Sequence, residues 1–68
     1  MTPDELKKVF RGQGYVRWDG IQQGGRYFLQ GILAQWVSGQ VVTSAILMDS
    51  NTKGKTIYQV KPTELKEI

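Results

Sequence analysis

The chain contains no cysteine and no histidine. The first absence excludes disulfides and thiolate metal sites, and the second removes the commonest metal ligand and the commonest general base at neutral pH. Nucleophilic triads of the usual kinds are therefore unavailable. The six carboxylates are spread along the chain, and Asp19 and Asp49 at predicted strand ends are better explained as turn caps than as Mg²⁺ ligands. We expect a non-catalytic protein without a metal or cofactor.

Long hydrophobic runs are also missing. No apolar stretch approaches the length of about 20 residues that a membrane-spanning helix needs, and no segment resembles a signal peptide. We therefore expect a cytoplasmic protein that does not associate with a membrane.

The chain has 68 residues, which makes a single domain. A chain this short buries only about 60% of its unfolded surface, so its stability is marginal without help. With disulfides and metals excluded, self-association is the remaining source of additional stability, and we expect a homo-oligomer. Nine Lys and Arg residues against six Asp and Glu give a net charge of +3, which is compatible with a polyanionic partner.

Residues 1–12 have the features of a short helix. Thr2 can cap it, Pro3 suits the first helical position, and Glu5 completes a capping box. Leu6, Val9 and Phe10 form one apolar stripe. A helix this short does not persist alone, so we expect the stripe to dock on its own domain or on a neighbouring subunit.

Residues 14–68 have the pattern of a small β-barrel. The strand-like segments are "YVRW" (15–18), "RYFLQGILAQWV" (26–37), "VVTSAILMD" (41–49) and "TIYQV" (56–60), and "PTELKEI" (62–68) predicts a 3₁₀ turn and an edge strand. Five strands without room for crossover helices must be antiparallel and strongly bent. The predicted fold is a short N-terminal α-helix followed by a five-stranded antiparallel small β-barrel.

The segment 26–37 has a glycine, Gly31, in its middle. A helix would have no amphipathic stripe and would lose about 1 kcal/mol at the glycine. A strand would be apolar on both faces, which suits a long strand that bends at Gly31 so that its halves bury opposite faces. We therefore predict a bent strand.

Aromatic and cationic residues alternate through the predicted strands. Such mixtures hold single-stranded nucleic acid, because bases stack on the rings while cations follow the phosphates. Large side chains also fill small barrels, so most of these rings are expected to lie in the core, and Trp36 and Tyr58 are the better candidates for exposure. Lys53 and Lys55 flank a glycine in a predicted turn and could grip a phosphate, although a solvated turn explains them as well. The set comprises Tyr15, Trp18, Tyr27, Phe28, Trp36 and Tyr58 with Arg17, Arg26, Lys53, Lys55 and Lys61.

Several segments resemble the Sm-like family, including the bacterial Sm-like RNA chaperone. "FLQGIL" followed by "AILMD" is similar to its first motif, and "TIYQVKPTEL" is similar to its second. The family's Tyr-Lys-His is replaced here by Tyr58-Gln59-Val60, and "VSGQVVT" lengthens the connection between strands. The resemblance implies an RNA-binding ring in which Gln40, Tyr58, Gln59 and Lys61 line the pore.

Two other small barrels have comparable patterns. "GYVRWDG", "GRYFLQGIL" and "TIYQVKPTEL" resemble an SH3-like or Tudor-like barrel, which implies a protein-interaction module, such as a phage or mobile-element product. "QGILAQW" and "KTIYQVKPTELKEI" resemble type II dihydrofolate reductases, whose Val-Gln-Ile-Tyr would fall on Lys55 to Tyr58 without the glutamine.

The sequence thus predicts an oligomeric, non-catalytic protein that binds RNA or single-stranded DNA. A protein partner is the alternative, and a reductase is a further one. The residues predicted to contact nucleic acid are Trp36, Gln40, Lys53, Lys55, Tyr58, Gln59 and Lys61.

Overall fold

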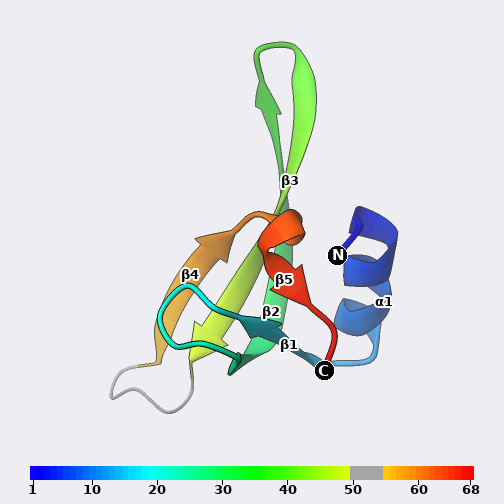
Figure 1. The fold of residues 1–68 in the computed structure, drawn as a ribbon. Helices are drawn as coiled ribbons and strands as arrows, with labels where there is room; N and C mark the ends of the chain where they lie inside the picture. Colours follow the sequence, from blue (N-terminus) through cyan, green and yellow to red (C-terminus); the bar gives the residue numbers. More distant parts are fainter. Residues whose placement is uncertain (50–54) are drawn as a thin grey trace.

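The computed structural model describes residues 1–49 and 55–68 of the chain. Its elements are α1 (Pro3–Arg11), β1 (Tyr15–Trp18), β2 (Gly25–Val37), β3 (Gln40–Asp49), β4 (Thr56–Val60), η1 (Pro62–Glu64) and β5 (Leu65–Lys66) (Figure 1). The predicted mainly β fold with one short N-terminal helix is confirmed. Within these described ranges, no helix is long and apolar enough to cross a membrane.

The strands form one antiparallel sheet in the order β4-β3-β2-β1-β5. Strands β4 and β5 are its two edges and are joined in sequence by the 3₁₀ turn η1. In the described part of the chain no ladder pairs β4 with β5, so the sheet is not closed into the barrel that the sequence predicted. All five strands nevertheless contribute a buried side chain to one core, which comprises Leu6, Val16, Tyr27, Leu29, Ala45, Leu47, Val60 and Leu65.

Helix α1 starts and docks as its sequence predicts. The Thr2 hydroxyl accepts a hydrogen bond from the Glu5 amide (3.2 Å), and the Glu5 carboxylate accepts one from the Thr2 amide (2.9 Å). Leu6 is fully buried in the core and Val9 packs against it, whereas Phe10 is 41% exposed. The helix therefore packs on its own chain through the first part of its apolar stripe.

Strand β2 changes its inward-facing residues halfway along, but the predicted burial of its second half is not found, because only Ile32 packs on the core and the residues from Ala34 onward are exposed. Tyr27 and Leu29 are buried before the register shift between Leu29 and Gly31, and Ile32 packs on the core after it. The shift places Gln30 as an extra residue in the ladder, a β-bulge that reverses which side chains point inward. The bulge, rather than the glycine, therefore produces the switch. A Cβ on Gly31 would make only ordinary contact with Ile46, at 3.8 Å.

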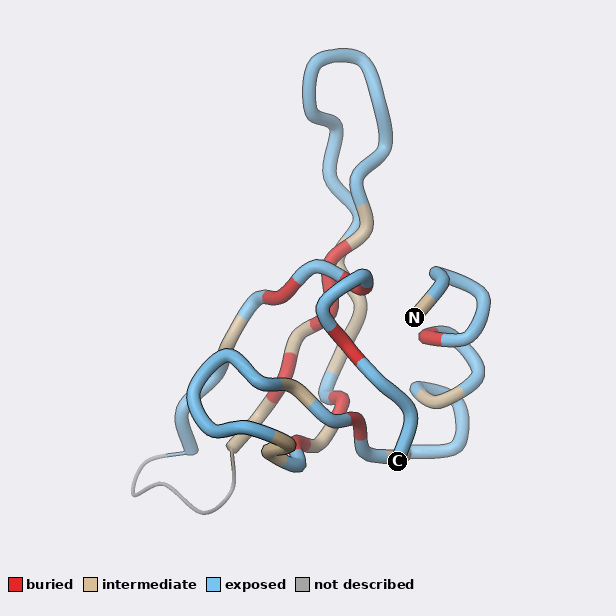
Figure 2. The backbone as a smooth tube through the Cα atoms, viewed as in Figure 1, coloured by how far each residue is buried: buried red, intermediate tan, exposed pale blue. Residues whose placement is uncertain are grey.

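The far half of the β2–β3 hairpin projects from the rest of the molecule (Figure 1). We call residues 33–44 the arm. β1 pairs with β2 only as far as Phe28, and β4 pairs with β3 only from Ala45 onward, so neither strand accompanies the arm. Its turn is Ser38-Gly39, and both residues have positive φ (51° and 80°), as a two-residue hairpin turn requires. This segment was predicted to form part of a barrel wall, but most of the arm is exposed (Figure 2).

Candidate functional site

A row of four apolar side chains crosses the outer side of the sheet. Tyr15 lies opposite Phe28, Phe28 opposite Met48, and Met48 opposite Ile57, one residue from each of β1 to β4. Opposite residues in an antiparallel ladder point to the same side of the sheet. The neighbours of this row in sequence, such as Val16 and Leu47, are fully buried in the core, so the row itself faces outward. We call these four residues the aromatic row.

The β1 end of the aromatic row is a cluster of two rings and a guanidinium. The rings of Tyr15 and Phe28 meet edge to face with their centroids 5.5 Å apart. The Arg26 guanidinium lies 4.3 Å from the centroid of the Tyr15 ring, within the range of a cation–π contact. Tyr15 is 41% exposed and Ile57 is 52% exposed, so both ends of the row remain accessible to a ligand.

Positive charges form a second row beside the first. On β1, Arg17 lies two residues after Tyr15 and is opposite Arg26 of β2, which lies two residues before Phe28. On its other side, Arg17 is opposite Lys66 of β5. Arg17 donates a hydrogen bond from Nη1 to the Gly24 carbonyl (2.8 Å), which holds its guanidinium near the loop between β1 and β2. Lys55 directly precedes β4, at the same end of the sheet. We call Arg17, Arg26 and Lys66 the cationic row.

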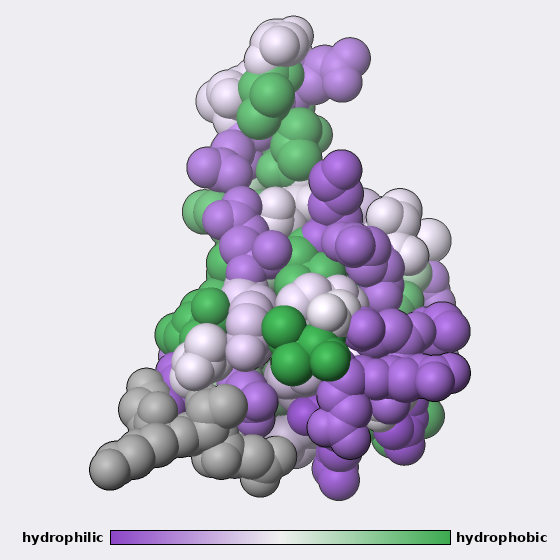
Figure 3. Space-filling view, turned by 60° about the vertical axis from the view of Figure 1, so that its left-hand side comes forward, coloured by the Kyte–Doolittle hydropathy of each residue, from purple (hydrophilic) through white to green (hydrophobic). Residues whose placement is uncertain are grey.

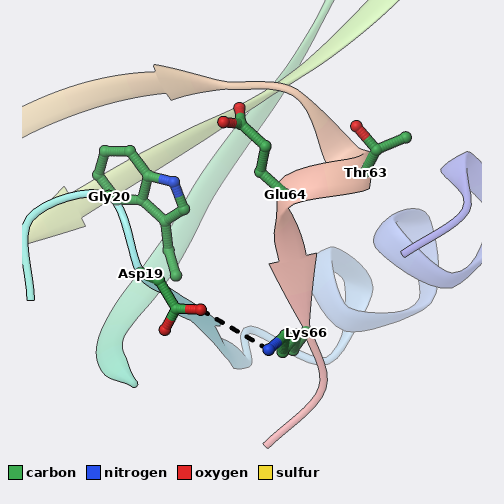
Figure 4. A pocket seen from close by; sticks show the side chains of 6 residues that line it. Asp19, Gly20, Thr63, Glu64 and Lys66 are labelled. Atoms are coloured by element: carbon green, nitrogen blue, oxygen red, sulfur yellow. Dashed lines mark ion pairs between the residues drawn. The ribbon is translucent and has the colours of Figure 1, made fainter. Parts of the chain in front are cut away.

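A groove lies at the end of β1, between the β1–β2 loop and η1 (Figure 4). The groove has a volume of about 380 Å³ and is lined by Trp18, Asp19, Gly20, Thr63, Glu64 and Lys66. The Trp18 ring also packs edge-on against Tyr27 and tilted against Tyr58, with centroids 5.6 and 5.2 Å apart. Three rings in mutual contact leave no space for a ligand between them, so only the outer part of the indole lines the groove.

Asp19 organises the loop at the edge of this groove. Its Oδ1 accepts a hydrogen bond from the Gly24 amide (2.6 Å), and its Oδ2 lies 3.6 Å from the Lys66 ammonium. The Gly24 hydrogen bond, helped by Lys66, holds the pKa of Asp19 below its ordinary value of 3.8. Figure 4 shows Asp19 and Lys66 pointing toward one another. Asp19 therefore acts as the turn cap that the sequence suggested.

The residues predicted to bind nucleic acid do not form one cluster. Trp36, which is 78% exposed as expected, and Gln40 lie on the arm next to its turn, far along the hairpin from Lys55 at the start of β4. Tyr58 is half-buried in the ring cluster with Trp18 and Tyr27. Gln59 donates hydrogen bonds to Gln35 and Ser44, both at 3.3 Å, and Lys61 is exposed just before η1. Lys53 and the turn predicted around it lie outside the described residues.

Four residues of the two rows were part of the general aromatic and cationic mixture but were not selected as site residues: Tyr15, Arg17, Arg26 and Phe28. A signal was present, because "Y-x-R" in β1 and "R-x-F" in β2 each place a ring and a guanidinium two residues apart, hence on one face of a strand. What the sequence lacked was the register that sets Tyr15 opposite Phe28 and Arg17 opposite Arg26.

Comparisons with known proteins do not add to this picture: no protein-family model, curated protein or solved structure matches the chain. Among the residues that the structure describes, no group of three or more acidic side chains is placed to hold a metal ion. The function must therefore be inferred from the geometry of the two rows and the groove.

Proposed function

We propose that this chain binds single-stranded nucleic acid, without catalysis, through the aromatic and cationic rows on the outer side of its sheet. The observation that carries the proposal is the exposed Tyr15 ring, which has the Arg26 guanidinium 4.3 Å from its centroid and Phe28 at its edge. Because the Arg26 guanidinium covers one face of the Tyr15 ring, a base would stack on that guanidinium plane or take its place on the ring, with its phosphates beside Arg17. Base–aromatic stacking contributes about 1–3 kcal/mol per base.

The geometry favours a single strand over a duplex. Bases must be unstacked from their neighbours to lie on side-chain rings, and this happens in single strands, loops and ends. Neighbouring strands of a sheet are about 4.8 Å apart, so a ring on β1 and a ring on β2 could contact one or two adjacent bases. Lys55 would extend the positive track beyond Arg26, whereas Lys66 is engaged by Asp19.

We also propose that the chain is related to the Sm-like or SH3-like small β-proteins, with an open sheet in place of a closed barrel. The order β4-β3-β2-β1-β5, the 3₁₀ turn between β4 and β5, and the single core shared by all strands support this assignment. The expected self-association and cytoplasmic location belong to the same proposal. Because Gln40 and Tyr58 lie apart here, we propose the outer face rather than a ring pore as the contact surface.

The proposal is tested by fluorescence anisotropy with labelled oligo-U and oligo-A at two salt concentrations. We expect binding that weakens as salt rises, since phosphate contacts release counterions. Tyr15→Leu keeps an apolar side chain but removes the ring that stacks, and should weaken binding about 5- to 100-fold. Phe10→Leu is the matched control, because Phe10 on α1 is equally exposed at 41% and lies outside both rows.

Charge variants test the second row. Arg26→Gln should weaken binding to all sequences alike and reduce the slope of log affinity against log salt by about 1, whereas Arg11→Gln on α1 should leave the slope unchanged. Absence of binding at low salt would contradict the proposal. Equal effects of the Tyr15 and Phe10 variants would also contradict it, since the binding would then not use the outer face.

The groove beside Trp18 supports a second candidate, an SH3-like module that binds an extended peptide. A 380 Å³ groove with an indole on one side and Asp19 and Glu64 at its border could hold a peptide with a basic side chain. In a Trp36→Phe background, Trp18 is the remaining tryptophan, and its emission should shift when a basic peptide binds. A shift that persists in Asp19→Asn with unchanged affinity would argue against this groove.

A further inference from the structure

The arm has two unpaired edges. Residues 33–37 of β2 pair only with residues 40–44 of β3, and in the described structure no further strand lies beside either segment. In a hairpin with a two-residue turn, the residues that flank the turn form a hydrogen-bonded pair, here Val37 and Gln40. Counting back from Val37, the backbone amides of Trp36 and Ala34 therefore point away from β3 and toward the open edge.

The arm is uncharged, and besides its glutamine, serine and threonine residues it exposes several apolar side chains. Between Arg26 and Asp49 the chain carries no charged residue. Trp36 is 78% exposed and pairs across the hairpin with Val41, which is 58% exposed, while Val37 and Val42 are exposed on the opposite face. Figure 3 shows hydrophobic residues on the projection, interspersed with hydrophilic ones. An isolated two-stranded hairpin is only marginally stable in water, so such an arm is expected to have a partner.

The kind of partner follows from these two properties. A nucleic acid would need cations, and a charged peptide would need counter-charges, and the arm has neither. Lipid would leave the outward amides of Ala34 and Trp36 without hydrogen-bond acceptors, at a cost of several kcal/mol each. A β-strand would cover the apolar side chains and would also form backbone hydrogen bonds with the open edge.

We propose that the partner is the arm of a second copy of this chain, paired antiparallel along β2 about a two-fold axis near Ala34. A segment paired with itself in this way matches in length, register and chemistry, as a closed two-fold interface requires. Other elements adjoin both strands of the hairpin, α1 on β2 and η1 on β3. We assign the pairing to β2 because its edge is free of strand pairing over a longer stretch: β1 pairs with β2 only as far as Phe28, whereas β4 pairs with β3 up to Ala45. Since all charged residues lie outside the arms, the contact brings no like charges together, although each chain carries +3.

This pairing gives Trp36 a cover that its own chain lacks. With Ala34 opposite Ala34 of the second copy, Trp36 lies opposite Ile32 of that copy, and the small alanines leave room for both indoles. The result is a four-stranded sheet made from two arms, which has the third strand that a stable sheet needs. The inference stands apart from the nucleic-acid proposal, because the residues of the aromatic and cationic rows are not in the arm.

The first test is the mass in solution by analytical ultracentrifugation over a wide range of concentration. The unmodified chain should form dimers, and Trp36→Lys should be monomeric with its far-ultraviolet circular dichroism retained. Ile21→Lys is the matched control: Ile21 is 63% exposed in the β1–β2 loop, outside the arm, and receives the same charge. A chain that stays monomeric at every concentration overturns the proposal, as does a dimer that Trp36→Lys leaves intact.

The second test identifies the edge, and it exploits the absence of native cysteine. Directly opposite residues of antiparallel strands have Cα atoms about 4.5–5.5 Å apart, within disulfide range. Under mild oxidation Ala34→Cys should form covalent dimers in high yield, whereas Thr43→Cys, opposite Ala34 on β3, should form few. Preferential cross-linking of Thr43→Cys would overturn pairing along β2. Equal and slow cross-linking of both variants would indicate random collision and overturn the dimer.

Discussion

At the scale of single residues, Gly20 and Gly31 differ in whether the surrounding structure leaves space for a Cβ atom. Gly20 lies under the indole of Trp18, and a Cβ there would come within 2.0 Å of the ring. Gly31 drew attention in the sequence because it interrupts the most apolar segment, yet a Cβ there meets nothing nearer than 3.8 Å and its φ is not positive. The sequence identified the glycine that looked unusual, while the glycine that packing requires is in an ordinary-looking turn.

This difference predicts the outcome of two alanine substitutions. Gly20→Ala must displace the Trp18 ring or the loop, and we expect a loss of about 1–3 kcal/mol in the free energy of unfolding, as in other overpacked sites. Gly31→Ala should leave stability unchanged or raise it by up to about 1 kcal/mol, because alanine restricts the unfolded chain more than glycine does. Urea denaturation followed by circular dichroism measures both. A large loss in Gly31→Ala would show that the bulge at Gln30 depends on the glycine after all.

At the scale of elements, the local signals in the sequence were sufficient. The capping box of α1, the bounds of β1 and β4, and the 3₁₀ turn with its short final strand all agree with the prediction. Each depends on residues close together in the chain. The arm was missed because Leu33, Val37 and Val41 are as apolar as buried residues, and apolar character alone does not distinguish a core strand from an exposed one.

A length argument could have revealed the arm. Strands β1 and β4 have four and five residues, whereas β2 and β3, which lie between them, have thirteen and ten. Short strands cannot cover long neighbours, so part of the central hairpin must extend beyond the sheet. The two outer rows, by contrast, required the pairing register, which depends on the bulge at Gln30 and on contacts between residues distant in sequence.

The β1–β2 loop should respond to acid in a defined direction. The pKa of Asp19 is lowered chiefly by the Gly24 amide, so the hydrogen bond is present at neutral pH, above the ordinary value of 3.8. Its stabilising effect should be lost as the pH falls through the lowered pKa of the folded state. The Gly24 amide proton, followed by NMR against pH, should shift upfield with a midpoint below 3.8, and Asp19→Asn should abolish the transition. A midpoint at or above 3.8 would contradict the hydrogen bond as the cause.

At the scale of the whole molecule, one small core must hold a helix and five strands together. It consists of eight buried apolar residues in the described structure, and Leu6 is the one that α1 contributes. Domains of this size have free energies of unfolding of about 3–10 kcal/mol, so each buried side chain carries a large share. The arm adds nothing to this core, which is consistent with a chain that gains further stability by association.

Leu6→Ala should therefore test how the helix and the sheet depend on each other. Truncating a fully buried leucine costs about 2–5 kcal/mol, enough to unfold much of the population of a marginal domain. Phe10→Ala, on the same helix but 41% exposed, should cost clearly less. Because Leu6 contacts the same core as Val16 and Leu65, we expect helix and sheet signals to be lost together in urea, by far-ultraviolet circular dichroism and Trp18 fluorescence in a Trp36→Phe background. If the helix signal disappears while the Trp18 environment persists, α1 is an accessory and the sheet folds without it.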